Sequence, residues 1–232
     1  MARGKWLLFL DADTWFEPGG LEKLLAFHPT GALAVIPRHL VRKPYEELSA
    51  FFNLLMALGT VPQGLAGQCL LISREDYDSV GGHSSVRSKV LENVNLAPIL
   101  RSDGVSTSSV VGQNLISFRM YPEGVRELVE GWTKGFAAGA ASTPKQTILL
   151  IALWISALIG ATIVPFLHPW GILLYLLFAM QLGWMLRKVG NFSWLTALFY
   201  PVSLLFYLIV FVRSLGKAGK DATWKGRKIH DL

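Results

Sequence analysis

Three long apolar runs in the C-terminal part of the chain place the strongest constraint on its fold. They extend over Thr147 to Leu167, Trp170 to Leu186 and Leu195 to Val212. Each approaches the roughly 20 residues that a helix needs to cross the hydrocarbon core of a bilayer. Hydrophobic residues make up 52% of the chain and charged residues only 16%, which is too apolar a balance for an ordinary soluble domain. The sequence therefore predicts a membrane protein in which residues 145–232 form the membrane region.

Basic residues beside these runs predict the orientation of the membrane region. Lys145 precedes the first run, and Arg187 and Lys188 follow the second, so the positive-inside rule places residues 1–144 in the cytoplasm. If the third run crossed the membrane completely, the basic C-terminal tail would lie outside the cytoplasm, which the positive-inside rule disfavours. Pro201 lies within the third run, where it either breaks the run into a re-entrant or interfacial segment or kinks a spanning helix. We expect a multi-pass protein of the cell membrane with two or three transmembrane helices.

The distribution of charge argues against nucleic acid as a partner. Residues 1–144 contain 13 basic and 14 acidic residues, a net charge of −1, whereas residues 145–232 contain 9 and 2, a net charge of +7. The net positive charge therefore belongs to the membrane half and is typical of loops at an anionic cytoplasmic leaflet. The single cysteine, Cys69, excludes an internal disulfide.

Residues 1–144 have the pattern of a mixed α/β domain, in which short apolar runs alternate with turns and helical patterns. Strands are predicted at Lys5 to Leu10, Ala32 to Pro37 and Gln68 to Ser73. Helices are predicted at Gly19 to Phe27, Tyr45 to Leu58, Arg74 to Val80 and Leu91 to Ser102. A further amphipathic pattern from Val125 to Phe136 predicts a helix that lies either on the membrane surface or on the domain core.

The strongest chemical motif is WLLFLDADT, from Trp6 to Thr14. Its apolar strand ends in Asp11 and Asp13, and a spacing of two residues places both carboxylates on the same side of an extended chain. Ligands of open α/β sheets bind at the carboxyl ends of strands, and paired carboxylates there suit Mg²⁺ or Mn²⁺ bound to a diphosphate. The alternative is that the two aspartates only cap the following turn or helix.

The segment from Gly4 to Leu24 resembles the DxD region of GT-A glycosyltransferases of family 2, which transfer a sugar from a nucleotide-diphospho-sugar. Later segments resemble the membrane-bound members of this family that glycosylate carotenoid acids. The similarity follows the same order over nearly the whole chain, in IPRHLVRKPYEELSAFFNLLMALG, SREDYDSVGGHSSVRSKVLENVNLA, SFRMYPEGVRELVEGWTKGFAAGAAS, RKVGNFS and WKGR. The resemblance implies a fold of class α/β, with a partial GT-A (Rossmann-like) domain over residues 1–144 followed by the transmembrane region.

The resemblance also implies roles for three carboxylates. Asp11 and Asp13 would hold Mg²⁺ or Mn²⁺ and the diphosphate of a UDP-sugar, and Glu92 would occupy the acidic catalytic position. The family pattern continues with Asp, but here Asn93 follows and cannot accept a proton. If the acceptor is a carboxylic acid, it is already ionised near neutral pH, so orientation matters more than a strong base. The alternative for Glu92 is a helix N-terminal residue stabilised by the helix dipole.

Six further residues are implied as substrate-binding, each with a structural alternative. The glycines and histidine of the Gly-Gly-His segment line the sugar pocket in the family or form only a turn. Trp132 lies near the acceptor in the family or anchors the chain at a membrane interface. In the tail segment of Trp224 and Arg227, the Arg227 guanidinium reaches a phosphate, or the basic side chain only snorkels at a membrane. These residues are Gly81, Gly82, His83, Trp132, Trp224 and Arg227.

Only ten residues precede Asp11, whereas the resembled family has its nucleotide-binding portion before the DxD. We therefore expect an exposed edge at the strand from Lys5 to Leu10, and little transfer by the chain without that portion. The resemblance implies transfer of glucose from a UDP-sugar to a lipophilic acceptor, above all a carotenoid carboxylate such as 4,4'-diaponeurosporenoate. The alternatives are glycosylation of another membrane lipid, such as a ceramide, diacylglycerol or hopanoid, and a non-catalytic membrane accessory protein derived from a truncated transferase.

Overall fold

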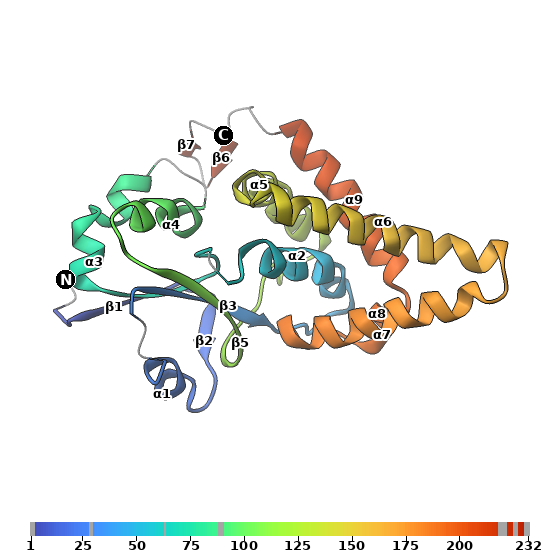
Figure 1. The fold of residues 1–232 in the computed structure, drawn as a ribbon, viewed down its shortest axis with the longest axis horizontal. Helices are drawn as coiled ribbons and strands as arrows, with labels where there is room; N and C mark the ends of the chain where they lie inside the picture. Colours follow the sequence, from blue (N-terminus) through green and yellow to red (C-terminus); the bar gives the residue numbers. More distant parts are fainter. Residues whose placement is uncertain are drawn as a thin grey trace.

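The computed structural model of the chain describes residues 3–27, 30–62, 64–87, 91–217, 222–224 and 227–229. It has two parts, a sheet with short helices around it and a group of longer helices beside the sheet (Figure 1). The N-terminus lies at the end of the sheet that is farthest from the long helices (Figure 1). The mixed α/β fold predicted for the first part is confirmed.

Five strands form the main sheet, and three of them end at the same edge. Only β3 and β5 pair in parallel, and the other neighbours are antiparallel, so β1, β3 and β5 point the same way. Within the described sheet β1 is an edge strand, as expected, and exposes Trp6, Leu8 and Leu10. The order is β1-β4-β3-β5-β2, with β1 (Trp6–Leu10), β2 (Thr14–Phe16), β3 (Ala32–His39), β4 (Cys69–Ser73) and β5 (Thr107–Phe118).

All three predicted strands are present as β1, β3 and β4, and their near-continuous apolar runs are buried in β3 and β4. The strands β2 and β5 were not predicted. Ser, Gly, Gln and Asn interrupt the apolar pattern of β5, which is held instead by its long pairing with β3. Pairing with a buried neighbour therefore overrides the weak local preference of this segment.

Short helices connect the strands at nearly the predicted positions. The stretch predicted as one helix over Tyr45 to Leu58 begins as a 3-10 helix because Pro44 starts it and the Glu46 carboxylate accepts hydrogen bonds from the backbone N–H groups of Arg42 and Lys43. The helices are α1 (Gly20–Leu25), η1 (Pro44–Ser49), α2 (Ala50–Thr60), α3 (Arg74–Ser79), η2 (Gly82–Val86) and α4 (Glu92–Ser102).

The amphipathic pattern forms α5 (Val125–Ser142), and the middle of its apolar stripe, at Leu128 and Trp132, packs on the core, whereas Val125 is exposed. Leu128 and Trp132 are buried, and the Trp132 ring stacks on Phe52 of α2 with ring centroids 4.8 Å apart. The helix also packs along α9. Of the two alternatives for this helix, the structure therefore has the one in which the stripe faces the core.

The first two apolar runs form α6 (Lys145–Leu167) and α7 (Gly171–Val189), an antiparallel hairpin (Figure 1). A Cβ atom at Gly171 would lie 2.6 Å from the backbone of Val164, so the close turn requires glycine. By length and composition, these two of the described helices are able to cross a membrane. The third run is interrupted at Phe199, two residues before Pro201, and forms α8 (Trp194–Leu198) and α9 (Tyr200–Lys217). Both the re-entrant segment and the kinked spanning helix stay predictions.

The long helices share a hydrophobic core with the sheet domain. Phe51 and Phe52 of α2 pack in the same cluster as Leu158 of α6, Leu182 of α7 and Tyr200 of α9. Burial of these large side chains on both sides stabilises the contact between the two parts. The helices α6 and α9 are thereby held beside the carboxyl-terminal edge of the sheet.

Candidate active site

The predicted DxD lies in the turn between β1 and β2. The Asp11 N–H donates to the Gln68 carbonyl (2.9 Å), and the Thr14 N–H and hydroxyl both donate to the Asp11 carbonyl (3.1 and 2.7 Å). The expectation that Asp11 and Asp13 lie on an extended chain is therefore wrong, because these hydrogen bonds fold the segment into a turn directly after the strand. The turn nevertheless lies at the carboxyl end of β1, as expected.

The negative charges of Asp13 and Glu92 affect the ionisation of Asp11. The pKa of Asp11 is raised to about 6, first by partial burial and then by the negative charges of Asp13 and Glu92. Glu92 is the first residue of α4, so it also lies where the helix dipole favours a negative charge. Within the described residues, no group of three or more His, Cys, Asp or Glu side chains has the geometry of a metal site. A cation at Asp11 and Asp13 would therefore need further oxygen ligands from a substrate.

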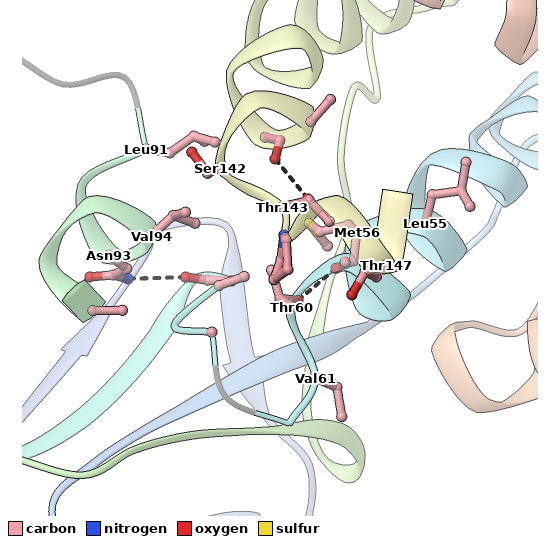
Figure 2. Close-up of a pocket in the computed structure, with 18 of the residues that line it drawn as sticks. Leu55, Met56, Thr60, Val61, Leu91, Asn93, Val94, Ser142, Thr143 and Thr147 are labelled. Carbon is pink, nitrogen blue, oxygen red and sulfur yellow. Dashed lines mark hydrogen bonds between the residues drawn. The ribbon is translucent and has the colours of Figure 1, made fainter. Parts of the chain in front are cut away.

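A cavity of about 900 Å³ lies beside Asp11 and Glu92, and Asp13 is not among the described residues that line it. Asp11, Gln68, Glu92 and Asn93 line it on the side of the sheet. In Figure 2, Asn93 and Val94 of α4 lie on one side, Leu55 and Met56 of α2 on the other, and the junction of α5 and α6 lies between them. The remaining walls include apolar side chains of three helices, namely Leu55, Met56, Ile148, Ile151, Ile155, Tyr207 and Phe211.

His83 lies behind the cavity wall and reaches the cavity through Asn93. The His83 Nε2–H donates to Asn93 Oδ1 (3.0 Å), and the Asn93 amide donates to the Gly67 carbonyl (3.1 Å). The Tyr77 hydroxyl lies 3.0 Å from His83 Nδ1 and accepts from the His83 backbone N–H (3.1 Å). Asn93, which departs from the family pattern, therefore ties the start of α4 to the loop before β4. Sequence reasoning missed this role because the partners come from three separate segments.

The two glycines of this segment shape the turn that carries His83. Gly81 and Gly82 have positive φ angles of 72° and 54°. A Cβ atom at Gly82 would lie 2.3 Å from the Tyr77 ring. Neither glycine is among the described residues that line the cavity. The two glycines allow the backbone of this turn to adopt positive φ angles, and their role in sugar binding stays a prediction.

Trp132 lines the cavity from inside the core. It is 5% exposed, and its indole N–H donates to the Ser49 hydroxyl (3.1 Å). The alternative of an interfacial anchor does not fit this burial. Trp224 and Arg227 belong to β6 (Ala222–Trp224) and β7 (Arg227–Ile229), and their side chains lie outside the described part of the chain.

Comparison with known proteins supports the motifs from which this site is built. Residues 1–79 match the family described as glycosyl transferase family 2. The chain is 30% identical over 247 aligned residues to the 4,4'-diaponeurosporenoate glycosyltransferases of Staphylococcus aureus strains USA300 and NCTC 8325 / PS 47. The alignment covers 96% of this chain, and the chain spans 66% of the length of these relatives. Residues 1–79, from β1 and the DxD to the end of α3, therefore match glycosyl transferase family 2, and nearly the whole chain is similar to the longer 4,4'-diaponeurosporenoate glycosyltransferases.

Proposed function

We propose that this protein transfers glucose from a UDP-sugar to a lipophilic acceptor, and that the acceptor is a carotenoid carboxylate. The observation that carries the proposal is that Asp11 and Glu92 line the same cavity as apolar side chains of α6 and α9. An acidic wall suits a cation and a diphosphate, and an apolar wall suits a lipophilic molecule. The name of the relatives, which specifies 4,4'-diaponeurosporenoate, supports the same class of acceptor.

Asp11 and Asp13 are the residues that would hold Mg²⁺ or Mn²⁺. The residues fit such an ion because partial burial and then repulsion from Asp13 and Glu92 raise the pKa of Asp11, and a cation would relieve that repulsion. Two carboxylates also leave coordination positions for diphosphate oxygens, which is how Mg²⁺ is usually bound with phosphates. When bound, the cation neutralises charge on the departing diphosphate.

The reaction exchanges one bond at the anomeric carbon for another. An acceptor oxygen attacks that carbon, the bond to the β-phosphate oxygen breaks, and UDP leaves with the bonding electron pair. Attack from the opposite face inverts the anomeric configuration. An ionised carboxylate loses no proton in this step, so orientation of the acceptor matters more than a base at Glu92. With a hydroxyl acceptor, Glu92 would accept the hydroxyl proton.

The proposal includes the location of the enzyme. Residues 1–144 would form a GT-A-like domain on the cytoplasmic face of the cell membrane, and residues 145–232 would form a multi-pass membrane region. Two observations support this arrangement: the length and composition of α6 and α7, and the excess of basic residues beside them.

The test supplies the protein in nanodiscs, fused to the nucleotide-binding portion that precedes the DxD in the resembled family, with radiolabelled UDP-glucose, Mn²⁺ and either a polyene carboxylic acid or the matching polyene alcohol. We expect label in the acid and its release by mild alkali, which cleaves an ester but not an alkyl glycoside. If label appeared only in the alcohol or in a bilayer lipid, that molecule would be the acceptor and the proposed carboxylate acceptor would be wrong. UDP binding without any transfer would favour the non-catalytic accessory protein.

A further inference from the structure

We propose that the Tyr121 hydroxyl is a further group of the active site, which donates a hydrogen bond to an oxygen of the leaving diphosphate. This inference rests on the proposed function, because it adds a second contact to the diphosphate that Asp11 and Asp13 would hold through a cation. Tyr121 lies just after β5 and lines the same cavity as Asp11 and Glu92.

The backbone of Tyr121 has a conformation that favours glycine. Of the described residues other than glycine, only Tyr121 and Asn114 have a positive φ angle, which is 57° at Tyr121. Asparagine adopts this conformation far more readily than a bulky aromatic residue does. A glycine would fit the backbone at position 121 without cost, so the tyrosine side chain lies there despite local strain. Strain of this kind is concentrated at functional sites, which makes Tyr121 a candidate.

Two side chains of η1 hold the strained segment in place. The Tyr45 hydroxyl donates to the Tyr121 carbonyl (2.9 Å). The buried Glu46 carboxylate pairs with the Arg119 guanidinium, with 2.6 Å between Glu46 Oε1 and Arg119 Nη2. These contacts fix the backbone at Tyr121 and two residues before it. The segment is therefore built to present the Tyr121 side chain in one orientation.

The Tyr121 ring packs against α5 and leaves its hydroxyl open to the cavity. The ring meets Trp132 edge to face, with 5.6 Å between ring centroids. A Cβ atom at Gly131 would lie 2.1 Å from the Tyr121 ring and 2.6 Å from its hydroxyl oxygen, so glycine leaves the room that this side chain needs. Within the described part of the chain, the hydroxyl has no hydrogen-bond partner and is not among the fully buried polar atoms. A group in the cavity can therefore accept a hydrogen bond from it.

The charges around Tyr121 select the kind of group that it binds. Burial, and then the negative charges of Glu127 and Asp13, raise the pKa of the Tyr121 hydroxyl, so it keeps its proton and acts as a donor. Asp13 also raises the pKa of Asp11, so the hydroxyl and the carboxylates of the DxD share one electrostatic environment. An anion would be repelled there unless a cation accompanied it. A diphosphate bound with Mg²⁺ or Mn²⁺ meets this condition, whereas a free carboxylate does not.

The hydrogen bond from Tyr121 strengthens as the bond to the sugar breaks. The diphosphate gains negative charge when UDP leaves with the bonding electron pair, and hydrogen bonds to charged oxygens are stronger than those to neutral ones. The hydroxyl therefore stabilises the transition state more than it stabilises the bound donor. The phenol keeps its proton throughout, so the contact adds no acid–base step.

Pyrophosphate tests the contact without a nucleotide base or an acceptor. Equilibrium binding of radiolabelled pyrophosphate to the protein in nanodiscs is measured at saturating Mn²⁺. Tyr121→Phe removes only the hydroxyl and should weaken pyrophosphate binding by about tenfold. Binding of Mn²⁺ alone, measured by electron paramagnetic resonance, should be unchanged. Tyr175→Phe is the control and should bind pyrophosphate normally, because its hydroxyl donates to the Leu198 carbonyl and Tyr175 is not among the described residues that line the cavity.

A matched pair of glycine substitutions tests the position of the hydroxyl. Gly131→Ala displaces the Tyr121 ring and should cause the same loss of pyrophosphate affinity as Tyr121→Phe, although the hydroxyl is still present. Gly160→Ala makes the same change on α6, where a Cβ atom meets nothing within 4 Å, and should leave the affinity unaltered. Alanine favours a helix over glycine, so both variants should fold. Gly131→Ala combined with Tyr121→Phe should cause no further loss, because either change alone removes the contact.

Kinetics distinguish the diphosphate from the acceptor carboxylate as the partner of the hydroxyl. In the fusion protein of the transfer test, Tyr121→Phe should lower kcat by about tenfold or more and leave KM for the polyene acid unchanged. A raised KM for the acid together with unchanged pyrophosphate affinity would mean that the hydroxyl binds the acceptor. That result would overturn the proposal.

Equal pyrophosphate affinity in Tyr121→Phe and the unmodified protein would refute the role of Tyr121 and leave the proposed function in place. A loss of affinity in Tyr121→Phe, with no sugar transfer to any acceptor by the unmodified fusion protein, would support the role of Tyr121 and refute the proposed function. If the unmodified protein bound no pyrophosphate in the presence of Mn²⁺, both proposals would be wrong. The two proposals therefore fail in distinguishable ways.

Discussion

At the scale of single residues, Asp11 connects the proposed chemistry to stability. Its ionised form is disfavoured in the folded protein, because partial burial and the charges of Asp13 and Glu92 raise its pKa from 3.8 to about 6. The folded state therefore binds a proton more tightly than the unfolded state does. The protein should lose stability as the pH rises from about 4 to about 6 in the absence of divalent cations.

Asp11→Asn should remove this loss. We expect the variant to be more stable than the unmodified protein above pH 6 by about 1 kcal/mol, a value reduced for solvent screening, and equally stable below pH 4. Thermal unfolding in detergent with EDTA, measured across this pH range, gives the difference. Asp78→Asn, a change at an exposed residue of α3, provides the control and should keep the same loss of stability with rising pH as the unmodified protein, because Asp11 is still present. Equal stability of the Asp11 variant and the unmodified protein at pH 8 would contradict the electrostatic account.

Substitution of Glu92 distinguishes a carboxylate acceptor from a hydroxyl acceptor. General base catalysis contributes about 10²- to 10⁴-fold when a proton must be removed, and an ionised carboxylate has none to remove. Glu92→Gln should therefore reduce transfer to a polyene alcohol by at least about 100-fold and transfer to the matching acid by about tenfold. Initial rates with both acceptors would show this ratio. Equal losses with both would mean that Glu92 is not a base for either acceptor.

At the scale of elements, the loop between α7 and α8 fixes the long helices to the sheet. The Asn191 backbone N–H donates to the His39 carbonyl (3.1 Å), its side-chain oxygen accepts from the Val41 N–H (2.6 Å), and its amide donates to the Val41 carbonyl (3.0 Å). Asn191 thus extends the end of β3 as a further strand residue would. The Glu47 carboxylate holds the next turn through the Thr196 hydroxyl (2.6 Å).

Asn191→Ala should weaken this connection. It leaves the N–H and carbonyl of Val41 without these partners, so we expect a loss of about 1–3 kcal/mol in stability. Hydrogen exchange should increase at the end of β3 and in the α7–α8 loop before it increases in the centre of the sheet. Asn191→Asp retains the oxygen acceptor and should have an intermediate effect. Unchanged exchange in the alanine variant would show that the loop contributes little to the connection.

Sequence patterns predicted elements whose burial is continuous and missed those that depend on a neighbour. The runs in β1, β3 and β4 are apolar enough to be read directly, whereas Ser108, Ser109 and Gly112 obscure β5. In the candidate site, Asp11 was proposed because paired carboxylates at the end of a strand are visible in the sequence, and Glu92 was proposed from the family resemblance. The contact of His83 with Asn93 was not predictable because the two residues meet only through the tertiary fold. The same holds for the residues of α6 and α9 that line the cavity.

At the scale of the whole molecule, the long helices expose a large apolar surface that a bilayer would cover in the proposed arrangement. Phe166, Leu167 and Trp170 at the tip of the hairpin are 87%, 78% and 72% exposed. A water-soluble protein rarely presents such a contiguous surface. After alkaline carbonate washing of membranes, we therefore expect the protein to remain in the pellet while a peripheral marker protein is released. Recovery in the supernatant would show that another surface, and not a bilayer, covers these helices.

The central claim is that Asp11 and Asp13 bind the donor diphosphate through a divalent cation. Electron paramagnetic resonance of free Mn²⁺, titrated with the full-length protein in the presence and absence of UDP, tests it without requiring an acceptor. We predict that UDP strengthens Mn²⁺ binding to the unmodified protein and to Asp78→Asn, and that this UDP-dependent binding is lost in Asp11→Asn and in Asp13→Asn. UDP-dependent Mn²⁺ binding of equal strength in all four proteins would contradict the account.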